Sequence, residues 1–127
     1  MVWEALTNPN ITEQYWGNTR LESDWKVGSK LLFRRGKQIT DEQTLLRIEP
    51  PKFLSYSFNP LFGEFAGEQP SRVTFELTSG NDVVKLVVTH DCFQFNSEVY
   101  LACLEGWPMI ISSLKSLLEC GQPLPDF

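Results

Sequence analysis

Residues 106–121 read GWPMIISSLKSLLECG and decide the fold of this 127-residue chain. With the residues just before them, they carry apolar side chains at spacings of three and four, which predicts a long amphipathic helix near the C-terminus. Ser97 is a favourable N-cap and Gly121 a favourable end, so this helix should span roughly 22 residues. Pro108 removes a backbone hydrogen bond within the helix, and we therefore expect a bend near Gly106. The apolar stripe comprises Leu104, Trp107, Ile111, Leu114 and Leu118.

The chain before this helix is patterned as strands. Apolar and polar residues alternate in residues 29–34, 43–59, 72–78 and 84–93, with turn residues between the segments and a proline pair dividing the second one. This pattern predicts an antiparallel meander of five consecutive strands with one apolar face and one polar face. The apolar face comprises Leu31, Phe33, Leu46, Ile48, Leu54, Tyr56, Phe58, Val73, Phe75, Leu77, Leu86, Val88 and His90.

Two short helices are predicted before the strands, one over residues 2–6 and one from Asn10 or Thr12 to Trp16. The fold class is therefore α+β, with a curved antiparallel sheet wrapped around the long C-terminal helix in a single domain, residues 1–127. Such a helix either fills the sheet completely or leaves a cavity between the two. In the loop around residues 63–70, Phe62 and Phe65 are placed to fold back over an opening.

Composition excludes several classes of partner. The formal net charge is -5 and the basic residues are scattered, so we expect no nucleic-acid partner and no binding to anionic membranes. No apolar run reaches the ~18 residues that a membrane span needs, and the first residues lack the layout of a signal peptide. Cys92, Cys103 and Cys120 are odd in number and lack metal-ligand spacing, which indicates reduced thiols, no metal and no cofactor, and a cytoplasmic location.

The order of these elements matches the helix-grip layout. The chain resembles the family of activators of heat shock protein 90 ATPase homologues, in the START-like (birch pollen allergen, SRPBCC) superfamily. The residues that carry the resemblance are VWEALTNPNITEQYW at 2–16, DWKVGSKLLFR at 24–34, LRIEPPKFLSYSF at 46–58, VKLVVTHDCF at 84–93, and the GW and SLKSLLE segments of the last helix. The resemblance implies a helix-grip domain without established catalytic residues, and the family name implies a chaperone partner.

The sequence departs from this family at its start. Members usually carry a strand before the segment that matches Val2, and in the family that strand pairs beside the last one. This first family strand is absent from the sequence, so we expect the strand between Val84 and Phe93 to be an unprotected edge. Either the domain forms a homodimer along this edge or its sheet is locally open.

His90 is the only histidine, and by parity it lies on the apolar face. As an enzyme residue it would be a general base, but Asp91 points to the other face and no second histidine or nucleophile motif accompanies it. The structural alternative is a histidine satisfied by a backbone carbonyl or by Tyr56. The sequence therefore identifies no catalytic residue.

We expect a noncatalytic START-like domain that binds a small hydrophobic molecule between the sheet and the C-terminal helix. Two alternatives stay open: a protein-interaction module related to chaperone ATPase activators, and an enzyme of the cyclase or hydrolase type, which the superfamily also contains. The candidate cavity-lining residues are Leu46, Ile48, Tyr56, Phe58, Phe75, Val88, His90, Trp107 and Ile111.

Overall fold

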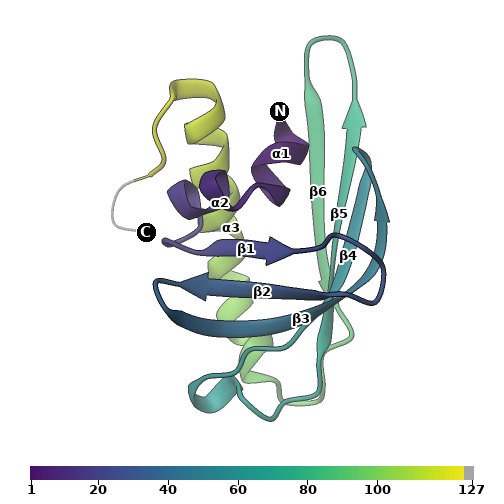
Figure 1. Ribbon diagram of the computed structural model, residues 1–127, viewed down its shortest axis with the longest axis vertical. Helices are drawn as coiled ribbons and strands as arrows, with labels where there is room; N and C mark the ends of the chain where they lie inside the picture. Colours follow the sequence, from purple (N-terminus) through teal and green to yellow (C-terminus); the bar gives the residue numbers. More distant parts are fainter. Residues whose placement is uncertain (125–127) are drawn as a thin grey trace.

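The computed structural model describes residues 1–124, which form one sheet and a small set of helices (Figure 1). All six strands are antiparallel, and each pairs with the next along the chain. The predicted α+β meander is confirmed, with β1 as one strand more than the alternation predicted. In chain order the elements are α1 (Val2–Thr7), α2 (Pro9–Tyr15), β1 (Arg20–Ser23), β2 (Lys30–Arg35), β3 (Gln38–Glu49), β4 (Phe53–Phe58), the 3-10 helix η1 (Gly63–Phe65), β5 (Ser71–Ser79), β6 (Val84–Asp91) and α3 (Glu98–Cys120).

The sheet curves around α3. In Figure 1, β1 to β3 run across the view and β5 and β6 run along its length, with α3 in the angle between them and α1 and α2 near one end of the helix. A strongly twisted sheet of this kind encloses a helix on its concave side. The helix-grip arrangement is therefore confirmed.

A β-bulge in the β2–β3 hairpin inserts one residue into β3. Phe33 pairs with Asp41 across the hairpin. The next pair along the ladder is Arg34 with Ile39, so Thr40 has no partner of its own. A bulge of this kind bends the strand and redirects neighbouring side chains. Both Thr40 and Asp41 consequently face the interior of the grip, which is important for the site described below.

A second bulge lies in β3 opposite β4 and corrects one prediction. Leu45 pairs with Tyr56 and Arg47 pairs with Ser55, which makes Leu46 the extra residue. Leu45 is buried, whereas Leu46 is 45% exposed on the outer side of the sheet. The prediction that Leu46 lies on the apolar face was wrong, because strict alternation does not survive a one-residue insertion.

The join between α1 and α2 differs from the prediction in its cap. Asn8, in extended conformation, caps α2 by accepting a hydrogen bond from the backbone N–H of Asn10. Pro9 occupies the first helical position, where its missing N–H costs nothing. The prediction of a cap at Asn10 or Thr12 was therefore wrong, and Thr12 instead lies buried within the helix.

The ends of α3 confirm the prediction. The hydroxyl oxygen of Ser97 accepts a hydrogen bond from the backbone N–H of Tyr100 at 3.0 Å, and Gly121 ends the helix in the left-handed region with φ of 80°. The helix continues through Pro108 as one element of 23 residues. The bend near Gly106 that the proline predicts stays a prediction.

The buried stripe of α3 is shifted from the predicted one. Leu114 is buried, and Trp107 and Leu118 pack against the core as predicted. Leu104 was placed on the stripe wrongly, because it is 55% exposed. Ile110 and Leu117 pack against the core in addition.

The core lies between α3 and the concave face of the sheet. Fully buried side chains from the strands meet Ala5 and Leu6 of α1 and Tyr15 of α2 there. Each large apolar side chain stabilises the fold by ~1.5–3 kcal/mol. The predicted apolar face is confirmed apart from Leu46, since its central members are Leu31, Phe33, Leu54, Tyr56, Val73 and Phe75, all buried.

Candidate functional site

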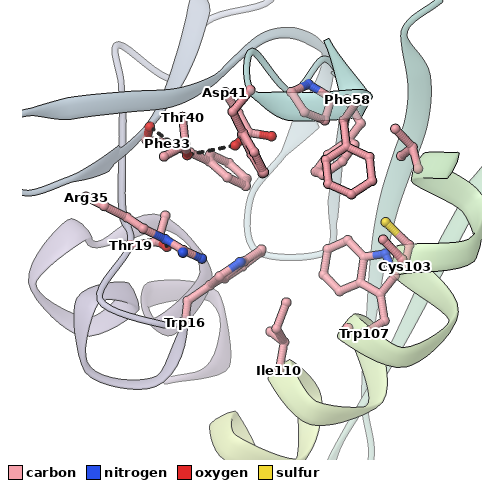
Figure 2. Close-up of a pocket in the computed structure, with 16 residues that line it drawn as sticks. Trp16, Thr19, Phe33, Arg35, Thr40, Asp41, Phe58, Cys103, Trp107 and Ile110 are labelled. Atoms are coloured by element: carbon pink, nitrogen blue, oxygen red, sulfur yellow. Dashed lines mark hydrogen bonds between the residues drawn. The ribbon is translucent and has the colours of Figure 1, made fainter. Parts of the chain in front are cut away.

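A cavity of about 250 Å³ lies between α3 and the part of the sheet formed by β2, β3 and β4 (Figure 2). We call it the α3 cavity. In Figure 2 the side chains from α3 lie on one side of this space and those of Trp16, Thr19 and Arg35 on the other. Apolar side chains form most of the lining, and those from the end of α2, the sheet and α3 include Trp16, Phe33, Phe58, Val99, Trp107 and Ile110.

Four aromatic rings form a continuous wall of the cavity. Trp16, at the end of α2, lies 5.5 Å from Phe33 and 5.6 Å from Trp107 between ring centroids. Phe33 in turn lies 6.3 Å from Phe58. All three contacts are edge-to-face, an arrangement in which the ring quadrupoles attract one another. The wall is therefore held in place by the rings themselves as well as by the backbone.

The loop around η1 adds two more aromatic residues. Phe62 and Phe65 pack edge-to-face with centroids 5.4 Å apart, and both line the α3 cavity. Phe62 is also exposed to solvent, so it lies at the rim. The sequence-based expectation that these two residues fold back over an opening agrees with their place in the structure.

The most buried charged group that lines the cavity is the carboxyl of Asp41, which is only 5% exposed. The Thr40 hydroxyl donates to Asp41 Oδ1 at 2.8 Å, and Gln43 Nε2 approaches Oδ2 at 3.4 Å. Burial raises the pKa of Asp41 above its usual value, against the opposing effects of these two hydrogen bonds and of the Arg35 charge. The α3 cavity thus contains a carboxyl group that water solvates poorly.

Two further groups border this polar end. Arg35 is exposed, and its Nε–H donates to Thr19 Oγ1 at 3.0 Å. Cys103 on α3 carries a thiol whose pKa burial raises to about 11, with smaller contributions from Asp41 and Glu68. A neutral thiol is a poor nucleophile, so Cys103 acts here as an apolar lining residue.

Tyr56 lies between the cavity wall and the core. Its ring centroid is 6.1 Å from that of Phe33 and 5.9 Å from that of Phe75. The side chain is completely buried, and its hydroxyl has no hydrogen-bond partner within the described part of the chain. Burial raises the pKa of Tyr56 well above its usual value, and the charge of Asp41 adds to the effect.

His90 uses both of its ring nitrogens in hydrogen bonds. The Trp107 indole N–H donates to Nδ1 at 3.0 Å, which leaves the proton on Nε2, 2.7 Å from the Ser71 hydroxyl. Burial lowers the pKa of His90 to about 4, and the nearby Asp91 charge offsets only part of this shift. The expected partners, a backbone carbonyl or Tyr56, were wrong. A neutral ring bound at both ends positions Trp107 and is a poor general base at neutral pH.

The sequence matches a known family over most of its length. Residues 1–119 match the family described as Activator of Hsp90 ATPase homolog 1-like protein. The chain belongs to this family.

Solved structures with the same fold support this membership, whereas no curated protein matches the chain. CalU16 from Micromonospora echinospora is 26% identical with a TM-score of 0.73, over 98% of this chain and 69% of its own. Protein MLL2253 from Mesorhizobium loti is 26% identical with a TM-score of 0.77, over 94% of this chain and 87% of its own. The Aha1 dimer from Colwellia psychrerythraea is 21% identical with a TM-score of 0.73, over 94% of this chain and 87% of its own, and at that identity it supports the fold alone.

Within this member of the Hsp90 ATPase activator homologue family, the nine residues proposed from the sequence do not all meet at one cavity. Phe58 and Trp107 line the α3 cavity. Leu46 faces outward beside Arg47. The other six do not line the cavity: Tyr56 and Phe75 are buried in the core, Ile48 and Val88 pack against it, and His90 and Ile111 are partly buried.

Sequence reasoning missed the polar end of the cavity. Its residues come from the β2–β3 hairpin, where β3 begins at Gln38 rather than at residue 43. Asp41, Gln43 and Leu45 alternate and are all buried. If the strand is taken to begin five residues earlier, and the inward-facing alternation of Leu45 is continued towards that start, Asp41 falls on the inner face. An acidic residue at an inward-facing position is the signal that could have revealed the polar end.

No group of three or more His, Cys, Asp and Glu side chains in residues 1–124 is arranged to hold a metal ion. None of the described helices combines the length and the apolar character needed to cross a bilayer.

Proposed function

We propose that this protein is a noncatalytic START-like domain that binds a small, largely apolar molecule in the α3 cavity. The observation that supports this best is the cavity itself, about 250 Å³ in volume and walled by aromatic rings. Ligand pockets combine an apolar lining with a few polar groups, as this one does. The bound pair His90–Trp107 fixes one ring of the wall, so we assign it a structural role.

Filling the cavity tests this function. Gly106 lines the cavity, and a Cβ added there meets no atom within 4 Å. Gly106→Leu should therefore occupy ligand space while favouring the helix, since glycine within a helix costs ~1 kcal/mol relative to alanine. Ethylbenzene, titrated against 15N-labelled protein, should shift the indole N–H signals of Trp16 and Trp107.

We expect Gly106→Leu to weaken ethylbenzene binding by at least about tenfold while leaving the melting temperature equal or higher. Glu105→Leu is the matched control, because it adds the same side chain at the exposed neighbouring position. If ethylbenzene binds the wild type and both variants alike, the α3 cavity is not the ligand site.

A second candidate function is protein interaction, for which the exposed apolar surface provides the observation. Tyr100, Leu101 and Leu104 of α3 are exposed, as are Val84 and Val87 of β6. Within residues 1–124, β6 pairs only with β5, so its other edge is open. The Colwellia relative is a dimer, and the family description names activation of the Hsp90 ATPase. We propose a second copy of this chain as the occupant of the β6 edge, with a chaperone as the competing one.

We also propose that the protein acts in the cytoplasm. Cys92, Cys103 and Cys120 are all free thiols. Unpaired cysteines are typical of a reducing compartment.

A further inference from the structure

The polar end of the α3 cavity is electrostatically unbalanced. Asp41 is buried, yet it forms no ion pair with any lysine or arginine in residues 1–124. Arg35 lines the same cavity but is exposed, and its described hydrogen bond goes to Thr19. A buried carboxylate without a counter-ion is costly, so a group that supplies positive charge would be bound favourably there.

The hydrogen bonds that Asp41 receives leave accepting capacity unused. A carboxylate has about four acceptor positions. Thr40 has a single hydroxyl proton, and that proton has two acceptors to choose between, Asp41 Oδ1 at 2.8 Å and the Phe33 carbonyl at 3.3 Å. The approach of Gln43 at 3.4 Å is long for a hydrogen bond. Asp41 can therefore accept one or more strong bonds from a bound molecule.

The rest of the cavity suits a cation as well. Trp16, Phe33 and Phe58 line it together with Asp41. The negative faces of aromatic rings attract a cation within ~6 Å, most strongly when water is excluded. Tyr56, whose ring packs against Phe33 of this wall, has a buried hydroxyl without a hydrogen-bond partner within residues 1–124.

We propose that the α3 cavity recognises an amine: a small aromatic or aliphatic body whose protonated nitrogen donates to Asp41 and lies against the aromatic wall. This assignment rests on the proposed ligand-binding function and names the ligand class of that site. A carboxylate ligand is the alternative, since it would pair with Arg35. Asp41 is the more buried of the two charges, so it dominates the recognition of a ligand that enters the cavity.

Three compounds with the same phenylethyl body separate these cases: 2-phenylethylamine, 2-phenylethanol and 3-phenylpropanoate. At pH 7 each is titrated against 15N-labelled wild-type protein, with the indole N–H signals of Trp16 and Trp107 as the readout. We expect the amine to bind at least about tenfold more tightly than the alcohol, and the carboxylate to bind most weakly. This comparison uses the wild type alone, so it does not depend on whether a variant folds.

The variant Asp41→Asn keeps the shape of the side chain and removes its charge. It should weaken amine binding by about tenfold and change alcohol binding by less than about twofold. Glu42→Gln is the matched control, because Glu42 is the adjacent carboxylate and pairs with Lys30. It should leave all three affinities unchanged.

The outcomes separate the two proposals. If the alcohol binds and the amine binds no more tightly, the amine assignment is overturned and ligand binding stands. If 3-phenylpropanoate binds most tightly and Arg35→Gln abolishes that preference, the cavity recognises acids and the amine assignment is again overturned. If none of the three compounds, nor ethylbenzene, shifts the indole signals, the ligand-binding function itself falls.

Discussion

His90 shows how a reactive residue type becomes a structural one. Its ring lies between the indole of Trp107 and the hydroxyl of Ser71, with a hydrogen bond to each. The rings of Phe58 and Phe93 flank it at 5.0 and 4.3 Å between centroids. Protonation would put a proton on Nδ1, where the Trp107 N–H already points. The neutral form is therefore the one that the folded state stabilises.

This arrangement predicts a pH dependence of stability. The pKa of His90 is about 4 in the folded state, against ~6.5 in the unfolded chain. Between these values the unfolded chain binds more protons, so the free energy of unfolding falls as the pH drops from 6.5 towards 4. Because the ring is partly exposed to solvent, we expect a loss of at most about 2 kcal/mol.

His90→Gln should remove this slope, because glutamine does not titrate. Urea unfolding at pH 7 and pH 5 measures the difference between the two proteins. His90 is the only histidine in the chain, so no other imidazole contributes. The raised pKa of Asp41 acts in the opposite direction, but it is common to both proteins and cancels in the comparison. Equal losses of stability in the wild type and the variant would contradict the prediction.

At the residue scale, the sequence predicted well which face of a strand a side chain occupies, and it predicted poorly where a strand contains an extra residue. Phe75 and Val73 lie on the inner face because β5 alternates without interruption. Leu46 is the extra residue of one β-bulge, and its face was predicted wrongly. Asp41 lies next to the other bulge, and its place in the cavity was missed. A bulge depends on how two strands pair, which no pattern within one strand records. Asp41 was missed for a different reason: the predicted strand began at residue 43, whereas β3 begins at Gln38 and the buried alternation of Gln43 and Leu45 extends back to Asp41.

At the scale of elements, the start of α3 depends on a residue far away in sequence. Glu68, in the loop after η1, accepts from the backbone N–H groups of Glu98 at 2.8 Å and Val99 at 3.2 Å. The Ser97 hydroxyl donates to the same carboxylate at 2.6 Å while accepting from Tyr100 N–H. Three of the four free N–H groups of the helix are thus satisfied.

Glu68→Ala should destabilise the protein by about 1–2 kcal/mol, because it removes a charged cap and the favourable interaction with the helix dipole. The loop that carries Phe62 and Phe65 should also become more mobile, since Glu68 links it to α3. Urea unfolding measures the first effect and amide hydrogen exchange of residues 62–68 the second. Glu64→Ala is the control, because Glu64 is an exposed glutamate of the same loop. Equal effects of the two substitutions would exclude the capping role.

The sequence predicted the ends of α3 better than its orientation. Caps are local, and Ser97 and Gly121 act as their residue types suggest. Which residues face the sheet depends on how the helix lies against it. The first half of α3 borders the cavity and the η1 loop, so Leu104 faces solvent while Ile110 lines the cavity. Apolar residues at spacings of three and four cover a wide face of a helix, so the sequence pattern is compatible with more than one rotation of α3 about its own axis.

For the whole molecule, the feature with the largest consequence is the edge of β6 that pairs with no strand in residues 1–124. An unprotected strand edge presents unpaired N–H and C=O groups to other chains. If two copies pair antiparallel about a two-fold axis at Val88, Lys85 of one copy lies opposite Asp91 of the other. Opposite charges facing each other across strands stabilise such a pair. Asp91 also forms an ion pair with Arg72 of its own copy. Each end of the shared ladder would therefore contain Lys85 of one copy beside Asp91 and Arg72 of the other.

Pairing along this edge predicts a dimer that a single added charge disrupts. Val87 is 40% exposed on β6, and Val87→Lys should weaken self-association by at least about tenfold, because lysine on an edge opposes strand addition. Val27→Lys is the matched control: Val27 is exposed in the turn before β2, away from β6. Sedimentation velocity over a concentration series measures both. We expect the wild type and Val27→Lys to dimerise and Val87→Lys to remain monomeric. A wild type that stays monomeric at millimolar concentration, or a dimer that Val87→Lys leaves intact, would show that the open edge is not where two copies meet.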